Sequence, residues 1–334
     1  MSCTIYDIAK LANVSKSTVS RVLNNQTNIS AEAKERVLNA IAELKYQPNK
    51  VARGLSSGFD AIMVISRSSR TTANNPFFSE IIQTISSKAE EENFDLILNT
   101  SHSSNDEIEK CKNKINEKMI KGILMLTAPA DEHFFKELDV FDIPIVVIGR
   151  LDGTYKNVYT VDTNNYQDSY DLINYLFEQG HRDIACLHSP LEYHVSIDRL
   201  KGYTDGILHH GLQLNNDWII NSGYTVESAY ESAKSLLLRS KRPTAVVAND
   251  DLKVWTLYKA AAELGISIPQ DLSVVGYSNS PFLSPALTRV EIPIEELGAV
   301  GSKILFGKIR GSKMESKTIV PTNKMCGESV SKLN

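Results

Sequence analysis

The chain has 334 residues, of which 42% are hydrophobic, 7% aromatic and 23% charged, with a formal net charge of −4. These proportions are ordinary for a globular protein, and the length is enough for two or three packed units. No apolar run approaches the roughly 20 residues of a membrane span and no charged-then-apolar leader opens the chain, so we expect a cytoplasmic protein without a membrane partner.

The four cysteines are scattered and form no CxxC pair; they are Cys3, Cys111, Cys186 and Cys326. Such a pattern is typical of reduced thiols and predicts neither a disulfide framework nor a zinc site. We therefore expect no metal and no cofactor.

The first 58 residues hold eight basic and four acidic side chains, which leaves the remainder of the chain with an excess of eight acidic ones. A small basic unit in front of a larger acidic one suggests a polyanion binder at the N-terminus. A solvated surface is the alternative, and charge alone does not decide between them.

Three short helices are predicted in this basic unit. Thr4 and Asp7 form a capping box ahead of apolar residues at helical spacing, Ser15 caps a second helix and Ser30 a third, and Pro48 ends the unit. Two short helices joined by a tight turn, with a third behind, indicate a helix-turn-helix module. A three-helix bundle that binds no DNA has the same spacing.

The second helix would enter the major groove, where Arg21 can reach guanine with two hydrogen bonds while other side chains contact phosphates. The candidate DNA-binding residues of the unit are Thr4, Tyr6, Lys16, Ser17, Thr18, Ser20, Arg21 and Asn24.

The segments "TIYDIAKLANVSKSTVSRVLN" at 4–24 and "YQPNKVARGL" at 46–55 resemble the headpiece of the LacI/GalR family of transcriptional regulators. The resemblance implies that Lys16, Ser17 and Arg21 read the operator. It also implies a hinge helix in the minor groove, with Asn49, Ala52 and Leu55 as contacts and Leu55 as a wedge between base pairs. An apolar wedge of this kind unstacks a base step at a cost of a few kcal/mol.

From residue 60 onward, short apolar runs alternate with amphipathic segments. Strands are predicted at 61–66, 95–100, 122–126, 144–149, 183–188, 245–250 and 273–277. Helices are predicted at 78–92, 165–179, 197–210, 226–239, 251–264 and 295–308. Alternating βα units predict parallel sheets covered on both faces, and so many units favour two lobes over one wide sheet.

The family resemblance implies the same α/β architecture: a helix-turn-helix headpiece followed by a two-lobed core like that of periplasmic binding proteins, with parallel sheets. Candidate crossings between the lobes lie at 158–162, 288–293 and 318–321. We expect a DNA-binding headpiece at 1–48, a hinge helix or linker at 49–58 and an effector-binding and dimerisation core at 59–334. The N-lobe would comprise about 59–161 and 291–319, and the C-lobe about 162–290 and 320–334.

Ligands of doubly wound sheets bind beyond the carboxyl ends of the strands. The candidate effector-binding residues that follow strands here are Phe77, Phe78, Thr127, Arg150, Tyr193, Asp198, Arg199, Asn249, Asp250, Ser278 and Asn279. Aromatic rings beside amides, carboxylates and arginines favour a neutral, hydroxyl-rich ligand. We expect Phe77 to face the cleft. Arg150 can equally pair with an acidic neighbour at the lobe boundary.

The resemblance implies effector contacts for Arg199, for Tyr224 and for the pair Asn249 and Asp250, whereas Ser278 stands where several relatives carry an aspartate. The segments "NNPFF", "VIGR", "VDTNN", "SIDRLKGY" and "GYSNS" are most similar to the maltose-operon repressors of Gram-positive bacteria. This similarity implies maltose or a maltodextrin as the small-molecule partner.

The sequence thus predicts a homodimeric repressor that leaves a palindromic operator when a sugar binds between the lobes. Three alternatives remain: a catabolite-control regulator with a phosphoprotein corepressor, a purine-responsive regulator, and a sugar-binding protein without gene control. An enzyme is not expected, because residues 276–280 lack the closing glycine of a nucleophile elbow and no P-loop or HExxH occurs.

Overall fold

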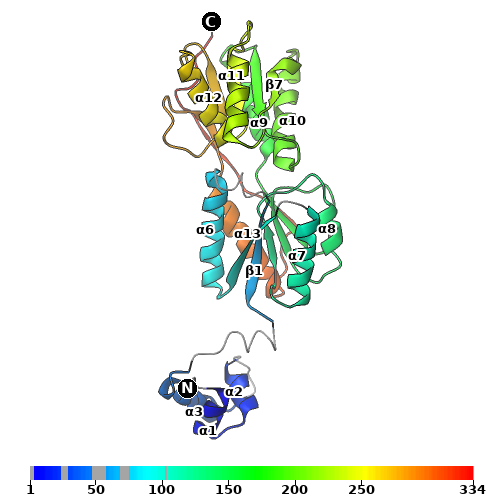
Figure 1. Cartoon of the computed structure of the whole chain (residues 1–334), viewed down its shortest axis with the longest axis vertical. Helices are drawn as coiled ribbons and strands as arrows, with labels where there is room; N and C mark the ends of the chain where they lie inside the picture. Colours follow the sequence, from blue (N-terminus) through cyan, green and yellow to red (C-terminus); the bar gives the residue numbers. More distant parts are fainter. Residues whose placement is uncertain (1–3, 24–28, 47–57, 68–74, 102–103, 334) are drawn as a thin grey trace. The chain divides into compact units, whose positions relative to one another are not determined.

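The computed structural model describes residues 4–23, 29–46, 58–67, 75–101 and 104–333. The chain divides into two compact units, residues 1–59 and 60–334 (Figure 1). The predicted residues Asn24, Asn49, Ala52 and Leu55 lie outside the described part.

The first unit contains the three expected helices: α1 at Ile5–Leu11, α2 at Lys16–Leu23 and α3 at Ala31–Glu43. Its first helix begins with the predicted box, in which the backbone N–H and the hydroxyl of Thr4 both donate to Asp7 Oδ2 at 2.8 Å. The Ser30 hydroxyl accepts from the Ala33 N–H at 3.3 Å and starts α3. A small apolar core joins the helices and contains Ile8, Ala9, Ala12, Val19, Val22, Val37 and Ala40.

The second unit contains two six-stranded sheets, each in its own lobe. The first sheet has the order β11-β5-β4-β3-β1-β2, and all its pairs are parallel. Its strands are β1 Ala61–Arg67, β2 Asp95–Ser101, β3 Ile123–Met125, β4 Ile145–Ile148, β5 Val158–Asp162 and β11 Lys317–Ile319. Its helices are α6 Pro76–Glu91, α7 Ser104–Asn116, α8 His133–Leu138 and α13 Ile294–Ile309.

Alternate side chains of one strand reach opposite faces of this sheet. Ile62 and Val64 of β1 pack with α6 and α13, whereas Met63 and Ile65 pack with α7 and α8. A parallel strand buried on both faces needs apolar side chains at successive positions, which is why the apolar run "AIMVI" predicts this strand.

The second sheet has the order β12-β10-β9-β8-β6-β7. Its strands are β6 Ile184–His188, β7 Ile219–Asn221, β8 Ala245–Ala248, β9 Ser273–Tyr277, β10 Thr288–Glu291 and β12 Asn323–Met325. Helices α9 Asn165–Glu178 and α10 His194–His209 cover one face, and α11 Val226–Leu237 and α12 Asp251–Glu263 cover the other. The edge strand β12 is antiparallel to β10 and so departs from the all-parallel expectation.

The chain passes between the two sheets after β5, after β10 and after β11. The first lobe is therefore completed by α13 and β11, which come late in the sequence. None of the helices in the described part of the chain combines the length and apolar character that a membrane crossing requires.

Candidate functional site

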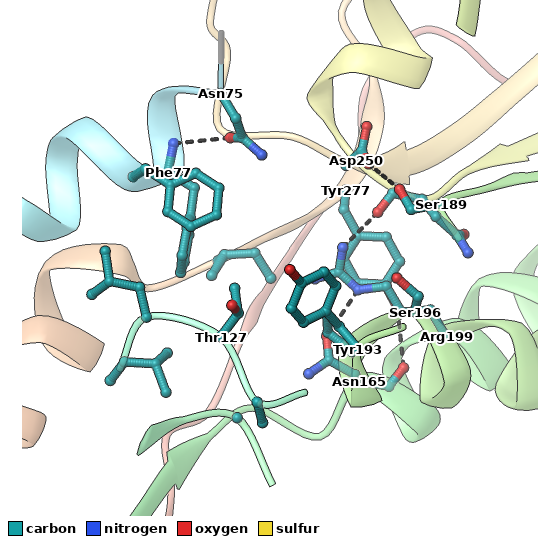
Figure 2. A pocket seen from close by; sticks show the side chains of 18 of the residues that line it. Asn75, Phe77, Thr127, Asn165, Ser189, Tyr193, Ser196, Arg199, Asp250 and Tyr277 are labelled. Carbon is teal, nitrogen blue, oxygen red and sulfur yellow. Dashed lines mark hydrogen bonds between the residues drawn. The ribbon is translucent and has the colours of Figure 1, made fainter. Parts of the chain in front are cut away.

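A cavity of about 570 Å³ lies between the carboxyl ends of strands from both sheets (Figure 2). This volume falls in the range of roughly 300–1,000 Å³ that is typical of small-molecule sites. Ten of the twelve predicted effector residues line it: Phe77, Phe78, Thr127, Tyr193, Arg199, Tyr224, Asn249, Asp250, Ser278 and Asn279.

The other two predicted residues, Arg150 and Asp198, do not line the cavity. Arg150 Nε and Nη2 donate to the two carboxylate oxygens of Asp198 at 2.6 and 2.7 Å, and Nη1 donates to Asp152. The predicted effector contact is therefore corrected, and the alternative of an acidic partner at the lobe boundary is what the structure contains. The pair joins the first lobe to α10 of the second.

Arg199 lies in the wall of the cavity, with its guanidinium 3.6 Å from the centre of the Tyr277 ring. Its Nε donates to Asn165 Oδ1 at 2.8 Å and its Nη1 to the Asn249 carbonyl at 2.5 Å. These contacts fix the plane of the guanidinium, while Nη2 has no partner within the described residues. A planar fork held in this way suits recognition of paired ligand oxygens.

Aromatic rings reach the cavity from both lobes (Figure 2). Asn75 caps α6 by accepting from the Phe77 N–H at 3.0 Å, which places Phe77 and Phe78 in the first turn. Phe78 is 7% exposed and belongs to the core of the first lobe, whereas Figure 2 shows the Phe77 ring projecting into the cavity. From the second lobe, the rings of Tyr193 and Tyr224 meet edge to face with centroids 6.2 Å apart.

Backbone contacts near Tyr193 connect the loops of the two lobes. The Ala130 N–H donates to the Glu192 carbonyl at 2.8 Å, and the His194 N–H donates to the Ala128 carbonyl at 3.0 Å. Gly149 lies behind this segment with φ of +123°, and a Cβ there would come within 2.7 Å of the Ala128 Cβ. Only glycine fits this close approach without strain.

The N-terminus of α12 supplies a buried ion pair. Asp250 is the N-cap of α12, and its Oδ1 accepts from the Lys253 N–H at 3.1 Å. Its Oδ2 accepts from the Ser189 hydroxyl at 2.8 Å and lies 2.8 Å from Lys253 Nζ. Burial alone would raise the pKa of Asp250, but Lys253 and these hydrogen bonds reverse the effect and lower it.

Two further carboxylates of the cavity have raised pKa values. Burial raises the pKa of Asp162 to about 6 and that of Asp251 to about 6. Asp162 Oδ1 accepts from the Thr163 N–H at 2.8 Å and from Asn165 Nδ2 at 3.0 Å, and Asp251 accepts from the Ser278 hydroxyl.

Two amides of the cavity are used differently. Asn279 exchanges two hydrogen bonds with the backbone of Ile292, at 2.8 and 2.9 Å, and so holds the crossing that follows β10. Asn249 is 3% exposed, and its Nδ2 has no hydrogen-bond partner among the described residues. A buried donor without an acceptor is costly, so Asn249 is suited to donate to a ligand.

Sequence reasoning missed several polar lining residues: Asp162, Asn165, Ser189, Ser196, Asp251 and Lys253. Asp162 ends β5 and Asn165 follows it, so the rule about carboxyl ends would have found both had this strand not been treated as a connection between lobes. Lys253 carries no such signal, because its burial depends on Asp250 and on the Gly223 carbonyl, which its Nζ contacts at 2.9 Å.

In the first unit, the buried positions of α2 are Val19 and Val22, and the predicted DNA-binding side chains lie elsewhere on the helix. Lys16, Ser17 and Arg21 are exposed, and Thr18 and Ser20 are partly exposed. Lys16 Nζ lies 3.7 Å from the centre of the Tyr6 ring, and that ring is 62% exposed. Thr4 is exposed at the start of α1. Within its unit, α2 thus exposes polar side chains on the side away from the apolar core.

The chain resembles known proteins over nearly its full length. Residues 4–49 match the family of bacterial regulatory proteins described as the lacI family, and residues 173–330 match the periplasmic binding protein-like domain. An HTH-type transcriptional repressor PurR from Erwinia tasmaniensis is 32% identical over 322 residues, which cover 95% of this chain and 93% of the relative. The PurR of Proteus mirabilis is equally similar, with the same coverage.

Solved structures agree with the fold. A transcriptional regulator CelR in complex with cellobiose is 28% identical, with a TM-score of 0.74 and coverage of 98% of this chain and 99% of that one. The lac repressor dimer bound to operator and the anti-inducer ONPF has a TM-score of 0.83 at 22% identity and covers 99% of this chain and 100% of its own. These likenesses confirm the predicted α/β architecture with a helix-turn-helix unit and a two-sheet core.

Proposed function

The chain belongs to the lacI family of bacterial regulatory proteins, and we propose that it is a homodimeric transcriptional repressor released from its operator by a sugar. Family membership agrees with the expected class, a regulatory protein and not an enzyme. The helix-turn-helix unit would bind one operator half-site. Two half-sites at fixed spacing require two such units, which is the reason to propose a dimer.

The observation that carries the sugar assignment is the composition of the cavity. Phe77 and Tyr193 offer aromatic faces to the C–H side of a pyranose ring, while Arg199 and Asn249 offer donors to its hydroxyl groups. Asp162, with its pKa near 6, adds an acceptor that is charged above that pH. Hydroxyl groups both donate and accept, so a neutral polyol can satisfy this mixed set.

A disaccharide is the size class that we propose, with maltose or a maltodextrin as the specific ligand. The volume of about 570 Å³ leaves room for more than one ring. A similar protein, CelR, has been solved with the disaccharide cellobiose. The sequence segments that resemble maltose-operon repressors add the maltose assignment.

A purine is the second candidate, favoured by the PurR relatives at 32% identity. The geometry argues against it at one point. A base sandwiched between Tyr193 and Tyr224 would need parallel rings, whereas their planes are inclined at 69° to each other. The hydroxyl of Tyr224 also donates to the Pro190 carbonyl at 3.3 Å, which holds that ring edge-on.

Release from DNA follows from linkage. The cavity is lined by residues of both lobes. A ligand that contacts both lobes therefore stabilises one relative arrangement of the lobes over another. A coupling of about 1–3 kcal/mol would change operator affinity by about 5–150-fold, and DNA would change sugar affinity by the same factor.

Calorimetric titration with maltose, glucose, galactose, hypoxanthine and guanine tests the assignment. Each compound that binds is titrated again in the presence of a palindromic DNA duplex selected from a random pool by the protein itself. Heat from maltose, with an affinity that DNA weakens, is the expected result. If only hypoxanthine or guanine releases heat, the effector is a purine and the sugar assignment is wrong. If none of the five compounds binds while DNA binding is intact, a small-molecule inducer of these classes is refuted. That result would favour a phosphoprotein corepressor.

Two substitutions separate the two sites. Arg199→Ala should abolish the response to sugar and leave DNA affinity within about twofold, whereas Arg21→Ala should weaken DNA binding by about 1–3 kcal/mol and leave sugar affinity unchanged. If both substitutions weakened the same property, two independent sites would be ruled out.

A further inference from the structure

We propose a binding site for one divalent transition-metal ion, best suited to Zn²⁺, formed by Glu132, Asp152 and His194 at the boundary between the two lobes. One oxygen of each carboxylate and one ring nitrogen of the histidine all lie within 4.8 Å of one another. His194 Nε2 is 3.5 Å from Glu132 Oε1 and 4.0 Å from Asp152 Oδ2. The proposal is independent of the identity of the effector.

The distances are close to those of a coordination sphere. Nitrogen and oxygen ligands bind Zn²⁺ at about 2.0–2.2 Å, so two ligands of a tetrahedral ion lie roughly 3.3–3.4 Å apart. The separation between His194 and Glu132 is already near this value, and that between His194 and Asp152 exceeds it by less than 1 Å. Small side-chain rotations are enough to complete the set.

His194 itself points to a missing ligand. The residue is 3% exposed, yet neither of its ring nitrogens makes a hydrogen bond to any part of the chain that the structure describes. Burying an imidazole without hydrogen-bond partners is unfavourable, and a metal ion at Nε2 would supply a partner to one of the two nitrogens.

The Glu132 carboxylate is held in place by two backbone N–H groups and a tyrosine hydroxyl. Glu132 accepts from the Asp152 N–H at 2.6 Å, from the Gly153 N–H at 3.0 Å and from the Tyr155 hydroxyl at 2.6 Å. Hydrogen bonds of this kind orient metal-binding carboxylates and keep them ionised. The Asp152 side chain is 75% exposed, so solvent reaches the site and can supply a fourth ligand.

The local charge also favours a divalent cation. Glu132, Asp152 and Asp198 contribute three negative charges, and Arg150, which pairs with the last two, contributes one positive charge. These four side chains together carry a charge of −2, which one divalent ion balances. A mixed nitrogen and carboxylate set suits Zn²⁺, Co²⁺ or Ni²⁺ better than Mg²⁺ or Ca²⁺.

The ligands come from both lobes. Glu132 is the N-cap of α8 and Asp152 follows β4, both in the first lobe, whereas His194 opens α10 of the second. The three positions are 20 and 42 residues apart, so no metal-ligand spacing is visible in the sequence. A bound ion would tie the lobes together beside Tyr193, which lines the cavity.

The test uses the untagged full chain, stripped of metal with a chelator and titrated calorimetrically with ZnCl₂. We expect one Zn²⁺ per chain, and visible absorption bands of four-coordinate Co²⁺ when CoCl₂ replaces it. His194→Gln and Asp152→Asn should each weaken Zn²⁺ binding by at least about 10–100-fold. Asp152 is exposed, so the second variant tests the site even where the first fails to fold.

His133→Gln is the matched control, because His133 is an exposed imidazole next to Glu132. It should leave both the stoichiometry and the affinity unchanged. The site would be refuted by the absence of stoichiometric Zn²⁺ on the unmodified chain. Equal affinities for the unmodified chain and Asp152→Asn would refute it too, as would a control that loses as much affinity as the site variants.

Discussion

Asp162→Asn should stabilise the folded protein at neutral pH. Asp162 ends β5, is 9% exposed, and has its pKa raised by burial from 3.8 to about 6. Its Oδ1 accepts hydrogen bonds from the Thr163 N–H and from Asn165 Nδ2. The amide oxygen of asparagine can accept the same two, so the substitution removes a charge and keeps the contacts.

The sign follows from the proton affinity of the two states. The folded chain holds the Asp162 proton more tightly than the unfolded chain, so stability falls as pH rises from about 4 to about 6. At 1.36 kcal/mol for each pKa unit, the charged carboxylate costs about 1.6 kcal/mol at pH 5 and about 3 kcal/mol at pH 7.5. The gain from Asp162→Asn should therefore grow by about 1.4 kcal/mol between these pH values, whatever constant difference the amide adds.

Urea unfolding of both proteins, followed by circular dichroism at pH 5 and pH 7.5, measures this growth. Asp142→Asn is the control, since Asp142 is an exposed carboxylate of the same lobe and should change stability by less than about 0.5 kcal/mol at either pH. A gain that is equal at the two pH values would refute the assignment of a raised pKa to Asp162.

Three other substitutions test packing and charge, each by the urea midpoint. Lys253→Met should cost about 3–5 kcal/mol, because Lys253 is 1% exposed and the Asp250 carboxylate, only 23% exposed, would lose its cation. Gly206→Ala should cost about 1–2 kcal/mol net, because a Cβ there would lie 2.8 Å from a side chain of α9, which outweighs the gain in helix propensity. Arg150→Gln should cost about 1–2 kcal/mol, because Asp198 loses a bidentate partner. The cost stays moderate since the Arg150 side chain is 36% exposed.

Each substitution has a counterpart that lacks the decisive feature. Lys259→Met changes a lysine that is 65% exposed, Gly298→Ala places a Cβ no closer than 3.1 Å to its neighbours, and Lys241→Gln changes a lysine that is 72% exposed. All three should lie within about 0.5 kcal/mol of the unmodified protein. If a control substitution lowers stability as much as its test substitution, the role given to burial, close approach or bidentate pairing is contradicted.

Much of the fold could be predicted because both sheets are buried on both faces. The apolar runs at 61–66 and 245–250 correspond to β1 and β8, and the helices between such runs begin within three residues of the predicted positions. Helix α7, with 13 residues, was missed, and so were two short elements. Strand β7 has three residues, and α8 has six, too few for a period to be recognised.

The cavity was largely predictable, since the carboxyl ends of parallel strands converge. The pattern left open whether Arg150 pairs with an acidic neighbour at the lobe boundary, and it could not identify that neighbour. Arg150 follows Gly149, which lines the cavity at the end of β4. Its guanidinium, however, is bound by Asp198, which lies 48 residues further along the chain. The burial of His194 depends likewise on contacts with the first lobe. The apolar pattern does not contain these contacts, and α10 begins three residues earlier than the pattern indicates.

The three passages of the chain between the sheets also determine which lobe can complete its fold first during synthesis. The apolar face formed by Ile62, Val64 and Val146 is closed by α13, whose residues are synthesised some 130 positions after β5. A nascent chain therefore carries an incomplete first lobe on the ribosome until almost the whole polypeptide has emerged. Segments exposed in this way are prone to aggregation, and the second lobe, contiguous from α9 to β10, has the opportunity to fold before the first.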